Sequence, residues 1–309
     1  MKVRVCMSAG ECARVFVDGQ EVDAIVRGEY PVTGDWVQAR WVEPGLILIE
    51  EIEPRCSKIA RRAAGRSGEE QVLAANVDIA FIVCGLDGDF NPRRIERYLA
   101  IAYDGNVRPV VVLSKADACA DVAAAIEQVR AEVLLVVSAL TGEGFEALEA
   151  MLTSGVTAVL LGSSGAGKST ILNRLLGGER QLTGAVRESD SRGRHTTTSR
   201  ELIFLPNGTA IIDSPGIREI QLLVSDEALG AVFDEIVELA AACRFGDCTH
   251  TNEPGCAVVG AVADDRLESF HKLQREAERL RGERTEKQRW RSIHKAQKRM
   301  YREREYNGG

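Results

Sequence analysis

The segment from Gly162 to Ser169 has the residue types and spacing of a phosphate-binding loop, Gly-x4-Gly-Lys-Ser. An apolar run, 156–161, precedes it and a helical pattern, 170–176, follows it, which is the context this motif requires. The glycines let successive backbone N–H groups surround the phosphates of a nucleoside triphosphate. We expect Lys168 to reach the β- and γ-phosphates and the Ser169 hydroxyl to bind Mg²⁺. The predicted nucleotide-binding residues of this loop are Gly162, Ser163, Ser164, Gly165, Ala166, Gly167, Lys168 and Ser169.

A second element of the phosphate site, Asp-Ser-Pro-Gly from Asp213 to Gly216, follows the apolar run 210–212. A carboxylate at the end of a strand can hold the hydration shell of Mg²⁺, and Gly216 can offer its N–H to the γ-phosphate. Alone, this tetrapeptide is a common turn sequence. Beside a phosphate-binding loop it favours the same nucleotide site.

Two further segments at the ends of apolar runs predict recognition of the base. The first comprises Ser114, Lys115, Ala116 and Asp117. In GTPases a Lys in this place packs along the purine ring, and the Asp accepts two hydrogen bonds from guanine that adenine cannot donate. The second comprises Ser138, Ala139 and Leu140, and it resembles the backbone loop that contacts guanine O6. Each segment alone could be a surface turn, but together they favour guanine.

The order of these segments predicts a rearranged fold. Both base segments precede the phosphate-binding loop, whereas an ordinary GTPase has them after it. Between Val77 and about residue 222, apolar runs alternate with helical patterns, so we predict an α/β domain with a mostly parallel sheet and helices on both faces. Such a sheet tolerates circular permutation, because loops at strand ends can be cut and rejoined. We therefore predict a circularly permuted P-loop G domain over residues 63–222.

Residues 1–62 are predicted to form a small β domain. Short apolar runs there are separated by turn signals such as Asp18-Gly19 and Pro44-Gly45, which favours a small barrel or sandwich. Residues 56–70 carry basic residues and glycines with few large apolar side chains, and we expect a linker or loop there.

The last part, 223–309, is predicted to be a mainly helical metal-binding domain. A helical pattern covers 228–242, and a long charged helix begins near Asp265. Between them, three thiols and one imidazole lie within fourteen residues, a set typical of closed, structural Zn²⁺ sites. The alternative is a group of reduced cysteines without metal. The predicted ligands are Cys243, Cys248, His250 and Cys256.

Charge and hydropathy limit the kinds of partner and the cellular location to be expected. From Arg266 onward, 14 Lys and Arg side chains accompany 7 Asp and Glu, although the whole chain carries a formal net charge of −7. This basic end suits RNA phosphates, and a solvated helix with alternating charges is the alternative. No apolar run is long enough to span a membrane and no signal peptide is evident, so we expect a cytoplasmic protein, as a monomer.

These motifs together resemble the ribosome small-subunit-dependent GTPase A (RsgA) family. The resemblance rests on the permuted order, on the segments 193–198 (Gly-Arg-His-Thr-Thr-Thr) and 213–216, and on the Cys/His cluster. It extends to 34–37 (Gly-Asp-Trp-Val) and 71–78 (Gln-Val-Leu-Ala-Ala-Asn-Val-Asp). It implies an N-terminal OB-fold, a permuted G domain, a C-terminal zinc domain, and a role with the small ribosomal subunit and its rRNA.

One residue departs from the family pattern. The base motif usually begins with Asn, which braces its loop against the P-loop, and here Ser114 stands in that place. Because Ser is shorter, we expect weaker binding of GTP and GDP. Asp117 remains, so the preference for guanine should survive.

Hydrolysis requires a group that orients water. Many GTPases use a Gln directly after the Gly of the Asp-x-x-Gly motif, but Ile217 lies there and cannot hydrogen-bond water. The candidate is His195, to which the resemblance also points; the alternative is an exposed loop residue that contacts rRNA or nothing. Thr196 or Thr197 would bind Mg²⁺ when GTP is present, with Thr197 as the expected ligand. Because the Gln is missing, we expect turnover to depend on the ribosomal subunit.

Three other functions remain open. A P-loop ATPase or nucleotide kinase with a zinc-binding tail is opposed by Asp117 and the segment 138–140. A non-catalytic, nucleotide-gated RNA scaffold is opposed by His195 and the complete set of Mg²⁺ ligands. A metal-dependent redox protein has little support, because no cysteine lies near a plausible cofactor site.

Overall fold

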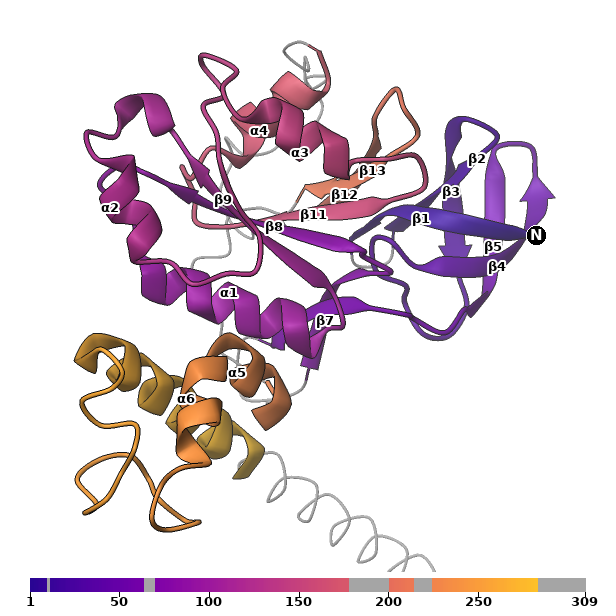
Figure 1. Cartoon of the computed structure of the whole chain (residues 1–309). Helices are drawn as coiled ribbons and strands as arrows, with labels where there is room; N and C mark the ends of the chain where they lie inside the picture. Colours follow the sequence, from indigo (N-terminus) through magenta and orange to yellow (C-terminus); the bar gives the residue numbers. More distant parts are fainter. Residues whose placement is uncertain (10–11, 64–69, 178–199, 214–223, 283–309) are drawn as a thin grey trace, which may run out of the picture. The chain divides into compact units, whose positions relative to one another are not determined.

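The computed structural model divides into two compact units: Met1–Ala60 with Val72–Ile220, and Arg61–Gln71 with Gln221–Gly309. The structure describes residues 1–9, 12–63, 70–177, 200–213 and 224–282 (Figure 1). In those residues, none of the helices combines the length and the hydropathy of a membrane-spanning segment.

A five-stranded barrel forms the N-terminal part of the first unit. Its strands are β1 (Lys2–Ala9), β2 (Cys12–Val17), β3 (Gln20–Val26), β4 (Trp36–Glu43) and β5 (Leu46–Ile52). Their order is β1-β2-β3-β5-β4, and the pairing of β4 with β1 closes the barrel around alternating buried residues such as Val5, Val15 and Ile47. The predicted small barrel is confirmed. Its first strand was not among the predicted runs, although Lys2–Ala9 alternates apolar and polar residues over part of its length.

The rest of the sheet belongs to the G domain. Its strands are β8 (Ile79–Gly85), β9 (Arg108–Ser114), β10 (Leu134–Val136), β11 (Thr157–Leu161), β12 (Arg200–Phe204) and β13 (Ala210–Asp213). They lie in the order β10-β9-β8-β11-β13-β12, and all are parallel except β12, which runs antiparallel to β13. The strand before the P-loop, β11, is central in space but comes fourth in the chain. The predicted permuted, mostly parallel sheet is confirmed.

Helices cover both faces of this sheet, as predicted. The helical elements are α1 (Pro92–Asp104), η1 (Ala116–Ala118), α2 (Val122–Glu127), α3 (Phe145–Met151) and α4 (Lys168–Leu175). Helices α3 and α4 lie over one face, and α1 lies over the other against β8 and β9 (Figure 1). On the first face, Leu148 and Ile171 are fully buried against Phe81 and Leu160. This core fixes the strand ends that carry the candidate site.

The barrel and the G domain share hydrogen bonds at a junction built from two motifs named above. Gly34 has φ +93°, and a Cβ there would lie 2.2 Å from the carbonyl oxygen of Ala75, so the close approach requires glycine. The side chain of Asn76 donates to the Gly34 carbonyl at 3.1 Å. From β1, Arg4 donates to the Asn76 carbonyl and to Thr157 Oγ1, each at 3.0 Å. The segments 34–37 and 71–78 therefore serve this junction.

The linker predicted for 56–70 is wrong in part. Strand β6 (Lys58–Arg62) pairs with β7 (Glu70–Ala75) in a separate two-stranded sheet. Ile59 is almost completely buried, and it is the one large aliphatic side chain in this basic stretch. Its burial stabilises a strand that the composition of the segment did not indicate.

In the second unit, helices α5 (Asp226–Val232) and α6 (Asp234–Ala240) replace the single helix predicted for 228–242. The break lies at Phe233, whose ring is fully buried and whose backbone (φ −119°, ψ 45°) leaves the helical region. A further helix covers residues 264–282 of the described chain, as predicted from Asp265. Its Arg266 donates to Glu235 at 2.7 Å and lies over the Phe233 ring, so this unit has a small core of its own.

Candidate nucleotide site and metal centre

The P-loop connects β11 to α4, and its glycines have the backbone geometry that such a loop needs. Gly162 has φ +149°, and a Cβ there would lie 2.3 Å from the carbonyl oxygen of Val83. Gly167, with φ +97°, caps the N-terminus of α4 without a side chain. The N-terminus of α4 therefore carries free backbone N–H groups and the positive end of a helix dipole, which together attract phosphate.

Lys168 lies in the loop itself. Its Nζ donates to the carbonyl oxygens of Gly162 at 3.0 Å and Ser163 at 2.6 Å. Burial lowers the pKa of Lys168, and the nearby carboxylate of Asp213 opposes that shift. Asp213 is the last residue of β13, which runs parallel to β11, so it lies at the same edge of the sheet as the P-loop. Ser164, Gly165 and Ser169 are exposed to solvent.

The first base segment is tied to the P-loop by Ser114. Its hydroxyl donates to the Ala166 carbonyl at 2.5 Å and lies 3.4 Å from the Cys84 carbonyl, and the side chain is buried. A Cβ on Gly167 would lie 3.3 Å from Ser114 Oγ, so the two loops touch closely. The shorter side chain at this position therefore still braces the base segment against the P-loop.

The two base segments also contact each other. The Ser138 hydroxyl donates to Asp117 Oδ1 at 2.5 Å, which leaves Asp117 Oδ2 for another donor. Lys115 has φ +60° at the turn after β9, and its Nζ pairs with Asp87. The side chains of Ser114, Lys115, Asp117 and Ser138 thus gather where β9 and β10 end.

An acidic segment after β8 was missed in the sequence. Asp89 accepts a hydrogen bond from the P-loop side chain Ser163 and pairs with Arg94 of α1 at 2.7 Å. Arg94, first, and Ser163 hold the pKa of Asp89 below its usual value. Asp87, held by Lys115, also has a lowered pKa. Their position directly after an apolar strand was the available signal, because carboxyl ends of parallel strands meet at one edge.

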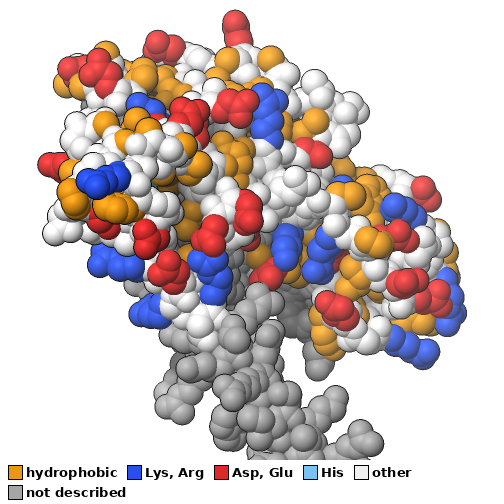
Figure 2. Space-filling view, turned by 60° about the horizontal axis from the view of Figure 1, so that its bottom comes forward, with side chains coloured by type: hydrophobic (Ala, Val, Ile, Leu, Met, Phe, Trp, Pro, Cys, Tyr) orange, Lys and Arg blue, Asp and Glu red, His pale blue; other side chains and the backbone are white. Residues whose placement is uncertain are grey.

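Several predicted residues lie outside the described residues. They are the proposed catalytic His195, the Mg²⁺ candidates Thr196 and Thr197, and Gly216. Ile217 is also outside them, as is most of the basic end of the chain. On the face of the molecule in Figure 2, Asp and Glu are interspersed with Lys and Arg.

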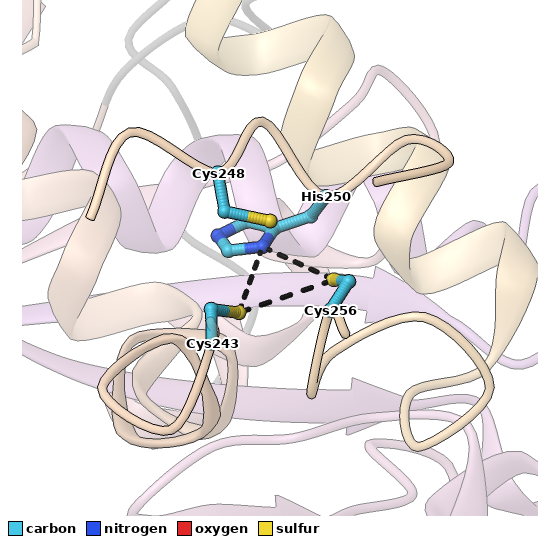
Figure 3. A group of neighbouring side chains, drawn as sticks. All are labelled: Cys243, Cys248, His250 and Cys256. Atoms are coloured by element: carbon cyan, nitrogen blue, oxygen red, sulfur yellow. Dashed lines mark hydrogen bonds between the residues drawn. The ribbon is translucent and has the colours of Figure 1, made fainter. Parts of the chain in front are cut away.

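The predicted metal ligands converge in the second unit. The thiols of Cys243, Cys248 and Cys256 and a ring nitrogen of His250 lie within 4.8 Å of one another, and Figure 3 shows them pointing toward a common centre. Cys243 Sγ lies 4.0 Å from Cys256 Sγ, and His250 Nδ1 lies 3.7 and 3.5 Å from these two sulfurs. In a tetrahedral Zn²⁺ site, bonds of about 2.3 Å to sulfur and 2.0 Å to nitrogen separate the ligand atoms by about 3.5–3.8 Å. The cluster fits such an ion.

The backbone around the cluster supports thiolates and a closed loop. The N–H of Ala257 donates to Cys243 Sγ at 3.3 Å, and that of Val259 donates to Cys256 Sγ at 3.5 Å. The Val259 N–H is the main cause that lowers the pKa of Cys256 to about 6. The Glu253 carboxylate, which the sequence did not single out, closes the loop around His250. It accepts hydrogen bonds from the N–H groups of Thr249, Thr251 and Asn252. Such outer contacts orient metal ligands.

Comparison with known proteins agrees with this arrangement. A profile described as RsgA GTPase matches residues 52–223, and one described as 50S ribosome-binding GTPase matches 157–291, beginning at β11. A protein of Lactiplantibacillus plantarum named small ribosomal subunit biogenesis GTPase RsgA 2 is 45% identical over 283 residues, covering 88% of this chain and 79% of that protein.

Two solved structures share the fold. The crystal structure of YjeQ from Thermotoga maritima aligns with a TM-score of 0.64 at 24% identity, covering 90% of this chain and 99% of that one. The structure of YloQ, described as a circularly permuted GTPase, aligns with a TM-score of 0.60 at 20% identity, covering 90% and 94%. The profile match, the identity to the curated relative and the permuted strand order lead to one conclusion: the chain belongs to the RsgA GTPase family.

Proposed function

We propose that this protein hydrolyses GTP to GDP and phosphate and assists the biogenesis of the small ribosomal subunit, with turnover stimulated by that subunit. The observation that carries the proposal is the meeting of Asp117, Lys115 and the P-loop at one edge of a parallel sheet, where the Ser114 hydroxyl joins them. The ribosomal role rests on the name of the 45% identical relative, small ribosomal subunit biogenesis GTPase.

In this proposal each residue has one task. The free carboxylate oxygen of Asp117 accepts hydrogen bonds from guanine, and the stem of Lys115 packs along the purine. Lys168 turns from its backbone carbonyls to the β- and γ-phosphates, and the N–H groups at the start of α4 surround them. Ser169 and Thr197 would hold Mg²⁺, which would neutralise phosphate charge. His195 orients the attacking water.

The remaining assignments complete the proposal. We assign 1–62 to an OB-fold domain, 63–222 to the G domain and 223–309 to a zinc domain with a basic C-terminal helix. Zn²⁺ held by the Cys/His cluster would support the fold of its loop, and the basic residues near the end of the chain would contact rRNA phosphates. The protein acts in the cytoplasm as a monomer.

The test is turnover of GTP and of ATP by the purified protein, with and without small ribosomal subunits. We expect GTP to be hydrolysed in preference to ATP, and small subunits to raise the rate. Equal rates with both nucleotides would support the ATPase alternative. No turnover even with subunits would support the nucleotide-gated scaffold, and stimulation by large subunits alone would contradict the choice of partner.

The catalytic assignment is tested by His195→Ala. We expect GTP binding to stay within about twofold of wild type and subunit-stimulated turnover to fall by about a hundredfold or more, the scale of loss when a group that positions a reactant is removed. GTP affinity of the same variant is the internal control. Wild-type turnover in this variant would remove His195 from the mechanism.

A further inference from the structure

The loop that follows β10 closes around a side chain of the P-loop helix. Arg174 lies six positions after Lys168 on α4, and its Nη1 donates to the carbonyl oxygen of Ala139 at 3.0 Å. Its guanidinium lies over the Phe145 ring, 5.0 Å from the centroid. A Cβ on Gly142 would lie 2.0 Å from Nη2, so the loop passes close to the guanidinium in the position that it takes here.

The loop itself is a compact turn. The Gly142 N–H donates to the Ser138 carbonyl at 2.8 Å, the Ser138 N–H donates to the Glu143 carbonyl at 3.0 Å, and the Thr141 N–H donates to Ser138 Oγ at 3.1 Å. Leu140, at its tip, is 80% exposed, so packing of its side chain does not fix the tip. Ser138 anchors one side of the turn to Asp117, and Arg174 anchors the tip to α4.

The anchored carbonyl determines the direction of the next N–H. In a planar trans peptide, the C=O of Ala139 and the N–H of Leu140 point in opposite directions. Because Arg174 holds the Ala139 carbonyl on the side of α4, the Leu140 N–H is directed away from α4. The Leu140 N–H therefore does not bond to that helix. This leaves it able to donate to the oxygen at position 6 of a purine.

We propose that Arg174 is a positioning residue for base specificity, which orients the Leu140 N–H of the loop 138–144 toward O6 of a guanine nucleotide. This inference rests on the proposed guanine-nucleotide function of the same site. A single helix then aligns both ends of the nucleotide. The N-terminus of α4 receives the phosphates, and Arg174 near its C-terminus sets the base loop.

The test uses Arg174→Ala and Arg174→Lys with two ligands, GDP and the diphosphate of 2-aminopurine riboside, which lacks the oxygen at position 6. We expect Arg174→Ala to weaken GDP about fivefold, which corresponds to about 1 kcal/mol, and to leave the 2-aminopurine nucleotide nearly unchanged. Lys keeps the charge but lacks the planar fork, so Arg174→Lys should recover only part of the GDP affinity. Arg130→Ala, another exposed arginine of the G domain, is the matched control for loss of charge.

Three results would overturn the inference. An equal loss of affinity for both nucleotides would show that Arg174 only stabilises the domain, and the melting temperature of each variant would confirm this. Unchanged affinity for both would show that the contact has no effect, and a similar loss of GDP affinity in Arg130→Ala would show a general charge effect. If wild type binds ADP as tightly as GDP, the proposed function fails first, and this result is distinct from the other three.

Discussion

The candidate nucleotide site and the Cys/His cluster would hold their ligands with different parts of the chain. In the P-loop the binding groups are mostly backbone N–H groups, and the essential residues are glycines whose conformation or contacts exclude a side chain, such as Gly162. In the cluster the thiols and the imidazole would themselves be the ligands of a metal ion. A backbone site therefore depends on shape, whereas a side-chain site depends on the identity of each ligand.

The difference explains why one departure from the family pattern is tolerated. Ser114 stands where the family's base motif usually has Asn, yet its hydroxyl still reaches the Ala166 carbonyl. A different side chain can supply the same contact there. In the cluster the four side-chain atoms themselves lie at metal-ligand spacing, so removing a thiol removes a ligand.

The largest expected effect follows from removing one metal ligand. We expect Cys256→Ala to lose bound zinc, because three remaining ligands hold a structural ion far less tightly and the site is not built for an open position. Zinc content should fall from about one per chain to near zero, and amide hydrogen exchange should rise across residues 243–262.

The control is Cys119→Ala, which removes a cysteine outside the cluster and should keep the metal. Helices α5 and α6 should stay protected from exchange in both variants, because Phe233 and Arg266 provide a core without the metal. Full zinc occupancy in Cys256→Ala would contradict the claim that the cluster depends on each of its four ligands.

The dependence of the P-loop on its backbone shape is tested by Gly162→Ala. The new methyl group would lie 2.3 Å from the Val83 carbonyl oxygen, at a φ that L-residues avoid, so the loop must move. We expect GTP and GDP affinity to fall by about a hundredfold, the effect of roughly 3 kcal/mol of backbone strain. The measurement is a binding titration with a fluorescent guanine nucleotide.

Gly177→Ala is the matched control for this change. Gly177 also has a positive φ (+76°), but no atom lies within 4 Å of the added Cβ and the position follows α4. Its cost should appear in the melting temperature and leave nucleotide affinity near wild type. If both variants bind nucleotide equally, the close approach of Gly162 to Val83 has no role in the site.

The smallest expected effect comes from Ser114→Ala. It leaves the Ala166 carbonyl without its hydroxyl donor, and one such hydrogen bond contributes about 1 kcal/mol, so nucleotide affinity should fall about fivefold. The ratio of GTP to ATP affinity should not change, because Asp117 is intact. A loss as large as that of Gly162→Ala would mean that a side chain controls this site as strongly as the backbone does.

The sequence predicted those parts of the site that depend on local spacing. Glycine positions, the acid at the end of β13 and the Cys/His spacing are features of short segments, and apolar runs placed the nucleotide-site segments at strand ends. The order of motifs also predicted the permutation. The break in the helix at Phe233 and the strand at Ile59 were missed. Both depend on side chains that are buried by packing against other segments of the chain.

Residues that act across the fold could not be predicted in this way. Arg174 and Ala139 are 35 residues apart, and nothing near either residue marks the other. The same holds for Asp89, which contacts Ser163 of the P-loop from the segment after β8. Such pairs are brought together by the three-dimensional arrangement of helices and strands. The sequence pattern indicates only the order of the strands.

The pairing of β1 with β12 has a consequence for how the chain is made. Ser8 pairs with Arg200 and Met7 with Glu201, so the barrel joins the G-domain sheet through residues at distant points of the chain. Translation at roughly 5–20 residues per second means that this part of β1 waits about 10–40 s for its partner strand to be synthesised. The barrel can close through β4 in that interval. The sheet as a whole becomes continuous only after residues 200 and 201 have been translated, which makes its completion a late step of folding.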